Sequence, residues 1–200
     1  MIIRVATTVD VPQIVNIHMN AFEGFFLTTL GRTFLSFYYK SFVNSKDGIV
    51  MCAVEDDKVC GFAAATKQCK GFNSNLIKTN FVSFIWLAFR LLFIRPSALI
   101  RLAKNLSKKS DVIDDPEDYA ELYSIGIADN MQGKGMGKKL LTAIEDQMKC
   151  DGVEKISLTT DFYNNDYAIA FYRTMGYQTL YEFTSYPNRK MYRFIKLLKQ

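Results

Sequence analysis

The sequence predicts a single α/β domain, of the mixed α+β kind, over residues 1–200. Short apolar runs typical of strands are separated by segments with the apolar spacing of helices, and no internal repeat interrupts them. One strand runs directly through a glycine-rich turn into an amphipathic helix. A chain of 200 residues buries roughly 70% of the surface that its unfolded state exposes, so neither disulfides nor metals are needed for a core.

The chain begins with a predicted strand and helix. Residues 2–6 form the strand, an apolar run too short for a signal peptide. Thr8 or Asp10 begins the helix, with Pro12 in its first turn, where the missing N–H of proline is tolerated. The apolar face of this helix is formed by Val11, Ile14, Val15, His18 and Phe22.

A second helix and a hairpin follow. Residues 23–29 link to a helix over about 31–43, which is rich in aromatic side chains. Strands at 48–55 and 58–66 are joined by a two-residue turn at Asp56-Asp57.

The second half alternates strands and helices. Its predicted elements are a strand at 117–127, the glycine turn, a helix to about Cys150 that buries Leu140, Leu141, Ile144 and Met148, a strand at 155–160, a helix from Asn165, and closing strands at 178–185 and 190–197 turned at Pro187-Asn188.

The glycine turn is suited to binding a pyrophosphate. Glycines at 133, 135 and 137 leave the backbone open, so amide N–H groups at a helix N-terminus can reach phosphate oxygens, and nearby lysines add positive charge. A nucleotide P-loop is excluded because Gly137-Lys138 is followed by Lys139 rather than by a hydroxyl residue. A Rossmann fingerprint is excluded because position 138, where its third glycine would stand, is lysine.

Two motifs instead resemble one family. Gln132-x-x-Gly135-x-Gly137, between a strand and a helix, resembles the coenzyme A motif of the GNAT superfamily of N-acetyltransferases. The segment 164–177, Asn-Asn-Asp-Tyr-Ala-Ile-Ala-Phe-Tyr-Arg-Thr-Met-Gly-Tyr, resembles its second signature. The residues agree with this: Asn165 can cap a helix, and Gly176 stands where a helix ends.

The resemblance implies the GNAT fold over nearly the whole chain: a single mixed, mostly antiparallel sheet of about seven strands, flanked by helices. It also implies a departure, because about fifty residues at 67–116 stand between the third and fourth strands, where that fold has a short connection. Residues 80–94 of this helical insertion are very apolar but too short to span a bilayer, which takes about 20 residues. We expect the insertion to pack on the domain or on a second subunit, to wall the acceptor side and to contribute to a homodimer contact.

The activity implied by the resemblance is direct transfer of an acetyl group from acetyl-coenzyme A to a primary amine in a ternary complex, with no metal. The backbone of residues 125–127 would pair with the pantetheine arm of acetyl-coenzyme A, and Asn165 would bind the same arm. The glycine turn would hold the pyrophosphate of the cofactor. The implied cofactor-binding residues are Ile125, Gly126, Ile127, Gln132, Gly133, Lys134, Gly135, Met136, Gly137, Lys138 and Asn165.

Two residues are the candidates for proton transfer. Tyr172 matches the general acid of the family, although a tyrosine at such a position is also a common core residue. Glu121 is the candidate base, because its strand resembles the one that carries a catalytic glutamate in some members; a solvated glutamate near a strand end is the alternative. His18, the only histidine, is expected to be a satisfied core residue.

The acceptor is less well defined by the sequence. Residues 21–31 resemble a subset of bacterial members encoded with surface-polysaccharide genes, which implies an amino sugar and acceptor residues Glu23 and Phe25. Tyr123 is a third candidate acceptor residue, because strand alternation puts its side chain on the same face of the sheet as that of Glu121. Polyamines, amino acids and protein N-termini stay open as acceptors. A non-catalytic acyl-coenzyme A sensing module is the alternative function.

The net charge and the cysteines indicate which partners and which cellular compartment to expect. The net charge of +5 is spread along the chain without a nucleic-acid-binding motif, so no nucleic-acid partner is expected. The four cysteines show no Cys-x-x-Cys pair. A turn at Asp56-Asp57 would pair Ala53 with Cys60. Cys52 would then lie on the other face of the sheet and could not form a disulfide with Cys60. Reduced cysteines favour a cytoplasmic location, without an integral membrane segment.

Overall fold

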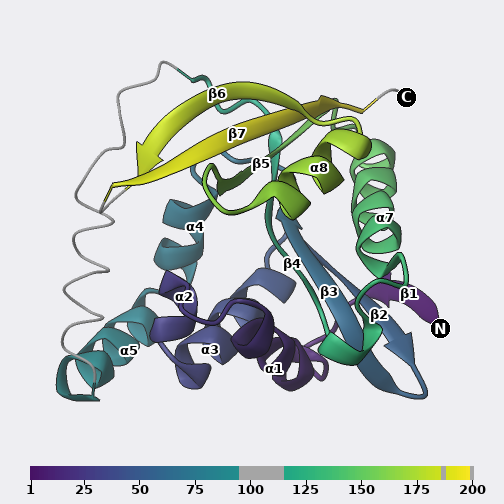
Figure 1. Cartoon of the computed structure of the whole chain (residues 1–200). Helices are drawn as coiled ribbons and strands as arrows, with labels where there is room; N and C mark the ends of the chain where they lie inside the picture. The colour runs from purple at the N-terminus through teal and green to yellow at the C-terminus, as the bar shows by residue number, and fades with distance from the viewer. Residues whose placement is uncertain (95–114, 186–187, 199–200) are drawn as a thin grey trace.

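The computed structural model describes residues 1–94, 115–185 and 188–198. Its sheet has the strand order β1-β2-β3-β4-β5-β7-β6, in which only β4 and β5 are parallel. The predicted fold class is therefore confirmed: a mixed, mostly antiparallel sheet of seven strands lies between helices (Figure 1). The elements are β1 Ile2–Val5, α1 Val11–Ala21, α2 Phe26–Thr29, α3 Arg32–Val43, β2 Gly48–Glu55, β3 Lys58–Thr66, α4 Phe72–Thr79, α5 Phe81–Ile94, β4 Ala120–Ile127, η1 Asp129–Met131, α7 Met136–Cys150, β5 Lys155–Asp161, α8 Asp166–Thr174, β6 Gln178–Ser185 and β7 Arg189–Leu197.

The sheet divides the apolar residues into two cores. Helices α1 and α3 cover one face, where the first core contains Ile14, Leu35 and Phe42. Helices α7 and α8 lie on the other face, where the second core contains Leu140 and Ile144. We refer to these two clusters below as the first and the second core. Their division follows from strand alternation, which sends successive side chains to opposite faces.

The β2–β3 hairpin has the predicted bounds and turn, but its register differs. Asp56 and Asp57 both have positive φ, at 48° and 59°, as a two-residue hairpin turn of this kind requires. A bulge between Ala53 and Val54 shifts the ladder, so Ala53 pairs with Gly61 and the predicted pairing with Cys60 is wrong.

The cysteines on this hairpin still lie on opposite faces. Cys52 is buried in the first core, whereas Cys60 packs against the second. All four cysteines are free thiols, as expected.

Asp10 stands at the N-cap of α1, but its side chain does not cap the helix. Its carboxylate accepts hydrogen bonds from the guanidinium of Arg4, each at 2.8 Å, and from the backbone N–H of Thr7 at 2.7 Å. The short helix α2 lies within the segment predicted to be a link. Beyond the hairpin, Glu117 has a positive φ of 53°, and β4 begins at Ala120 rather than at residue 117.

The described part of the insertion packs on the domain. Phe72 and Leu76 of α4 and Leu87 of α5 are buried in the first core, and the ring of Phe84 contacts that of Phe37 edge-on at 4.9 Å. Residues 95–114 of the insertion, and Pro187 in the predicted β6–β7 turn, lie outside the described residues. Within the described ranges, no helix is long and apolar enough to cross a membrane.

Strands β4 and β5 are paired over only part of their length. Their ladder joins only Ala120–Leu122 to Ile156–Leu158, and beyond it the two strands diverge. On the other edge of β4, Ala65 pairs with Leu122 and Ala64 with Ser124, so Tyr123 is the extra residue of a β-bulge. The divergence leaves the β5-facing edge of β4 open beyond Leu122, next to a space between the two strands.

Candidate active site

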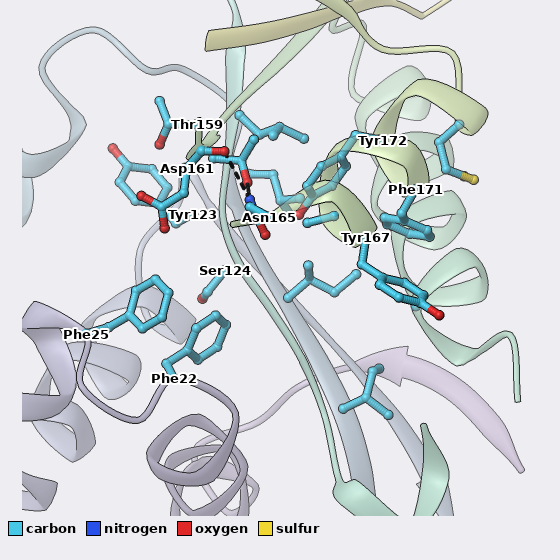
Figure 2. Close-up of a pocket in the computed structure, with 18 of the residues that line it drawn as sticks. Phe22, Phe25, Tyr123, Ser124, Thr159, Asp161, Asn165, Tyr167, Phe171 and Tyr172 are labelled. Atoms are coloured by element: carbon cyan, nitrogen blue, oxygen red, sulfur yellow. Dashed lines mark hydrogen bonds between the residues drawn. The ribbon is translucent and has the colours of Figure 1, made fainter. Parts of the chain in front are cut away.

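A cavity of about 940 Å³ occupies this space. It is bounded by the open edge of β4, the end of β5, the glycine turn, α8 and the end of α1. Figure 2 shows Tyr167, Phe171 and Tyr172 of α8 on one side, Phe22 and Phe25 on the other, and Ser124 between. Of the predicted site residues, the cavity is lined by Phe25, Tyr123, Ile125, Ile127, Gln132, Gly133, Gly135, Met136, Gly137, Lys138, Asn165 and Tyr172.

The glycine turn forms one end of the cavity. Gly133 and Gly135 have positive φ values of 75° and 71°, and no atom lies within 4 Å of where a Cβ would stand at either residue. Gly135 is the N-cap of α7, so the first amide N–H groups of this 15-residue helix point out of its N-terminus without intrahelical acceptors. Lys138 lines the cavity, whereas Lys134 does not and contacts the sulfur of Met131 at 3.4 Å. This end therefore suits a diphosphate anion.

The three β4 residues predicted to bind the cofactor do not all face the cavity. Ile125 and Ile127 line the cavity and pack against the second core. Gly126 is not a lining residue; a Cβ there would stand 2.9 Å from the ring of Phe62 on the other face. Gly126 therefore contributes backbone to the open edge of β4, and its lack of a side chain is needed for packing against β3 and α1.

Helix α8 supplies Asn165 and Tyr172. The Asn165 side chain does not cap the helix; its amide donates to the hydroxyl of Thr160 at 2.5 Å and to the backbone carbonyl of Asp161 at 3.2 Å (Figure 2). These bonds tie the start of α8 to the end of β5. Burial raises the pKa of Tyr172 to about 12, so this phenol is protonated at neutral pH.

Glu121 is not brought into the cavity. Its side chain is buried, with 9% of the residue exposed, and forms an ion pair with the equally buried Arg193 of β7. The thiol of Cys69 also donates to its carboxylate at 3.0 Å. Burial and, to a lesser extent, this carboxylate raise the pKa of Tyr123, whose side chain lines the cavity. In this structure Glu121 is therefore a buried carboxylate that neutralises an arginine, and its role as the general base stays a prediction.

The other end of the cavity is aromatic and charged. Phe22 and Phe25 line it, and the guanidinium of Arg189 lies 4.9 Å from the centre of the Phe25 ring. Arg189 also donates two hydrogen bonds to the carboxylate of Asp161. Glu23, predicted as an acceptor residue, lines an adjoining cavity of about 350 Å³. The two cavities share Phe25, Phe26, Asp161 and Arg189.

Sequence reasoning did not identify Ser124, Asp161 or Arg189 as site residues. Arg189 reaches Asp161 only because β7 pairs with β5. Ser124 reaches the cavity through the bulge at Tyr123. The signal for Asp161 is its place at the end of a strand that precedes the Asn165 motif; the bulge leaves no comparable pattern in the sequence.

His18 departs from its expected role as a satisfied core residue. It is buried, at 3% exposure, yet it lines the cavity, and its Nε2 has no hydrogen-bond partner among the described residues. Lowered by burial, its pKa is about 4, so the ring is neutral at pH 7. Elsewhere in the described ranges, no group of three or more histidine, cysteine, aspartate or glutamate side chains is arranged to hold a metal ion.

Comparisons with known proteins identify a family and a fold. A family model described as the acetyltransferase (GNAT) family matches residues 11–177. The mycothiol acetyltransferase of Renibacterium salmoninarum is 36% identical over 73 residues, which cover 34% of this chain and 21% of that protein. The chain thus spans about a fifth of the length of this curated relative.

Two solved structures share the fold. The ribosomal-protein-S18-alanine N-acetyltransferase of Escherichia coli superposes with a TM-score of 0.61 at 16% identity, covering 100% of this chain and 94% of that one. The ribosomal-protein-alanine N-acetyltransferase of Brucella melitensis gives a TM-score of 0.64 at 18% identity, covering 99% of this chain and 100% of that one.

Proposed function

The chain belongs to the acetyltransferase (GNAT) family, and from this premise we propose that it transfers an acetyl group from acetyl-coenzyme A to a primary amine of a small molecule. The observation that carries the proposal is the continuity of the cavity. One space of about 940 Å³ joins the glycine turn to the aromatic and charged end, and Tyr172 lines the same space. Both reactants can therefore meet in one ternary complex.

The described residues fit acetyl-coenzyme A. The open backbone at Gly133 and Gly135 and the N-terminus of α7 would hold its pyrophosphate, and the free edge of β4 at Ile125–Ile127 would pair with its amide-containing arm. Asn165 would bind the same arm. Bound there, acetyl-coenzyme A supplies the activated acetyl group.

Tyr172 is the proposed proton donor. Its hydroxyl is protonated at neutral pH because burial raises its pKa to about 12, and its side chain lines the cavity. A phenol in that position can protonate the sulfur that leaves. No cysteine lines the described cavity, which favours direct transfer over an acetyl-cysteine enzyme intermediate.

The acceptor end favours a cationic amine. Arg189 is already paired with Asp161, whereas the carboxylate of Glu23 in the adjoining cavity has no ion-pair partner among the described residues. The faces of Phe22 and Phe25 can also contact an ammonium group. An amino sugar fits this description, as do small polyamines, and the four free thiols fit a reducing compartment such as the cytoplasm. Protein N-termini are the second acceptor class, since the two structural neighbours are named as alanine N-acetyltransferases.

The experiment is an acceptor panel. The purified chain is incubated with acetyl-coenzyme A and glucosamine, spermidine, lysine or a peptide with N-terminal alanine, and released thiol and acetylated product are both measured. We expect thiol release that depends on one class of amine and matches the acetylated product in amount. Cofactor binding without turnover on any amine would instead favour the non-catalytic sensing module.

A further inference from the structure

Three polar side chains from three different elements form a buried chain that ends in the cavity. The Nδ1 atom of His18 on α1 lies 2.7 Å from the hydroxyl of Tyr39 on α3. That hydroxyl lies 3.0 Å from Oγ of Ser124 on β4, and Ser124 lines the cavity. Tyr39 is fully buried, at 0% exposure, so the middle of the chain is shielded from water.

The arrangement is costly as a purely structural feature. The other ring nitrogen of His18, Nε2, has no partner among the described residues. An unsatisfied buried polar atom costs about 1–3 kcal/mol. The rings around His18 belong to Phe22, Phe62 and Tyr39, so apolar side chains would fill the same space without that cost. Such a group calls for a functional explanation.

We infer that His18, Tyr39 and Ser124 form a relay that takes a proton from the acceptor amine; this inference rests on the proposed acetyl transfer. In this proposal the relay acts as the general base. It has this role instead of Glu121 because the Glu121 carboxylate is paired with Arg193 and does not line the cavity. Ser124 is the group of the relay that touches the amine, and His18 and Tyr39 act through it.

The proton transfer balances along the three groups. The amine attacks in its neutral form, after its ammonium proton has passed to water in the cavity. As the amine nitrogen bonds to the acetyl carbon, an N–H bond breaks and its electron pair stays on nitrogen; the bond between the acetyl carbon and sulfur then breaks, and its electron pair leaves with the sulfur that Tyr172 protonates. The proton moves to Oγ of Ser124, the Ser124 hydroxyl proton moves to the oxygen of Tyr39, and the Tyr39 proton moves to Nδ1 of His18. Ser124 and Tyr39 end neutral and the imidazole ends protonated; the proton returns to water by the reverse path when the product leaves. Tyr172, having protonated the sulfur, regains its proton from water.

The direction of transfer fixes the resting tautomer. Ser124 must donate to Tyr39 and Tyr39 to Nδ1, so neutral His18 must carry its proton on Nε2. Among the side chains whose rings pack against His18, only Tyr39 titrates, and burial raises the pKa of Tyr39 well above the ordinary value. The tautomer is therefore set by this one hydrogen bond.

The first test is nuclear magnetic resonance on the untagged chain, in which His18 is the only histidine. The imidazole nitrogens should report the Nε2–H tautomer, with titration only near pH 4 as its lowered pKa of about 4 requires. An Nδ1–H tautomer would point the hydrogen bonds the wrong way and overturn the relay.

The second test is kinetic and uses the panel amine that the wild type acetylates fastest. General-base catalysis is worth about 10²–10⁴-fold, so Ser124→Ala, Tyr39→Phe and His18→Gln should each lower kcat at least about tenfold at pH 7. The loss should shrink as pH rises, because hydroxide can then take the proton. The double variant Ser124→Ala/His18→Gln should lose no more than either single variant, since the groups act in series.

Tyr38→Phe is the matched control. Tyr38 neighbours Tyr39 on α3, is 8% exposed and packs against the rings of Phe34, Tyr39 and Phe42, but it does not line the cavity. Loss of the Tyr38 hydroxyl should leave kcat within about twofold of the wild-type value. All variants should keep the thermal stabilisation by acetyl-coenzyme A. A pH-independent loss, or a wild-type rate in Ser124→Ala, would overturn the relay alone. A wild type that acetylates no amine would overturn the proposed function instead.

Discussion

Tyr172 couples a packing role with a chemical one. Its ring lies against Tyr177 and Phe194 of the second core, while its side chain lines the cavity. We predict that Tyr172→Phe keeps the affinity for acetyl-coenzyme A and lowers kcat at least about tenfold, because only the proton donor is removed. Steady-state turnover and calorimetric cofactor binding test this. Tyr177→Phe, which removes a buried phenol hydroxyl outside the cavity, should leave turnover intact; equal losses in both variants would assign Tyr172 to packing.

Glu121 holds Arg193 in the protein interior. Removing one partner of a buried ion pair leaves an uncompensated charge, which typically costs about 3–5 kcal/mol. Glutamine can still accept a hydrogen bond, so we predict that Glu121→Gln lowers the free energy of unfolding by about 2–3 kcal/mol in urea denaturation. Its kcat at permissive temperature should stay near that of the wild type.

Asp118→Asn is the comparison for Glu121→Gln. It breaks the pair with Lys155 at the surface, where Asp118 is 59% exposed, and should hardly change stability. A Glu121→Gln variant of wild-type stability whose rate falls at neutral pH and recovers at high pH would restore the catalytic base expected from the sequence.

The glycine turn and α7 together form the anion-binding element. Gly135 has a φ of 71° and open space around its missing Cβ, and it stands at the helix N-terminus in the cavity. We predict that Gly135→Asp abolishes the rise in melting temperature produced by acetyl-coenzyme A, because a carboxylate would occupy the anion site. Thermal melting with and without the cofactor measures this.

Gly152 offers a matched control at the other end of α7. Its φ is 76°, it also has open space around its missing Cβ, and it lies outside the cavity. Gly152→Asp imposes the same backbone strain and should retain the ligand-induced shift. A Gly135→Asp protein that is folded and still stabilised by the cofactor would contradict the assignment of the turn.

For the molecule as a whole, the described part of the insertion extends the first core. Leu76 and Leu87 are buried with α3 residues, and no described side chain of α4 or α5 lines the cavity. That the insertion walls the acceptor side stays a prediction, because residues 95–114 lie outside the described residues. We predict that Leu76→Ala lowers the free energy of unfolding by about 2–4 kcal/mol, as cavity formation in a core does, while cofactor stabilisation persists.

Val82→Ala provides the surface comparison, because Val82 on α5 is 80% exposed. It should change the free energy of unfolding by no more than about 0.5 kcal/mol. If Leu76→Ala were equally mild, the insertion would not belong to the core, and sedimentation of the wild type would then test the homodimer contact predicted from its apolar sequence.

The sequence by itself determined the elements and the two motifs. Strand bounds at 48–55, 58–66 and 178–185 and the end of α7 at Cys150 follow from local patterns, since periodicity, turn residues and glycine positions act over a few neighbours. The residues of the glycine turn and Asn165, which the two motifs single out, line the cavity. A motif that resembles a family also implies the fold of that family, so the two motifs suffice to predict the seven-stranded sheet.

Only the tertiary structure decided which side chains meet. The bulge at Tyr123 turns Ser124 toward Tyr39, 85 residues away, and pairing of β5 with β7 brings Arg189 to Asp161. The tertiary structure likewise buries Glu121 against Arg193, 72 residues away, so that Glu121 is not among the residues that line the cavity. Such contacts depend on strand register and on packing between distant segments, and a shift of one residue sends a side chain to the opposite face.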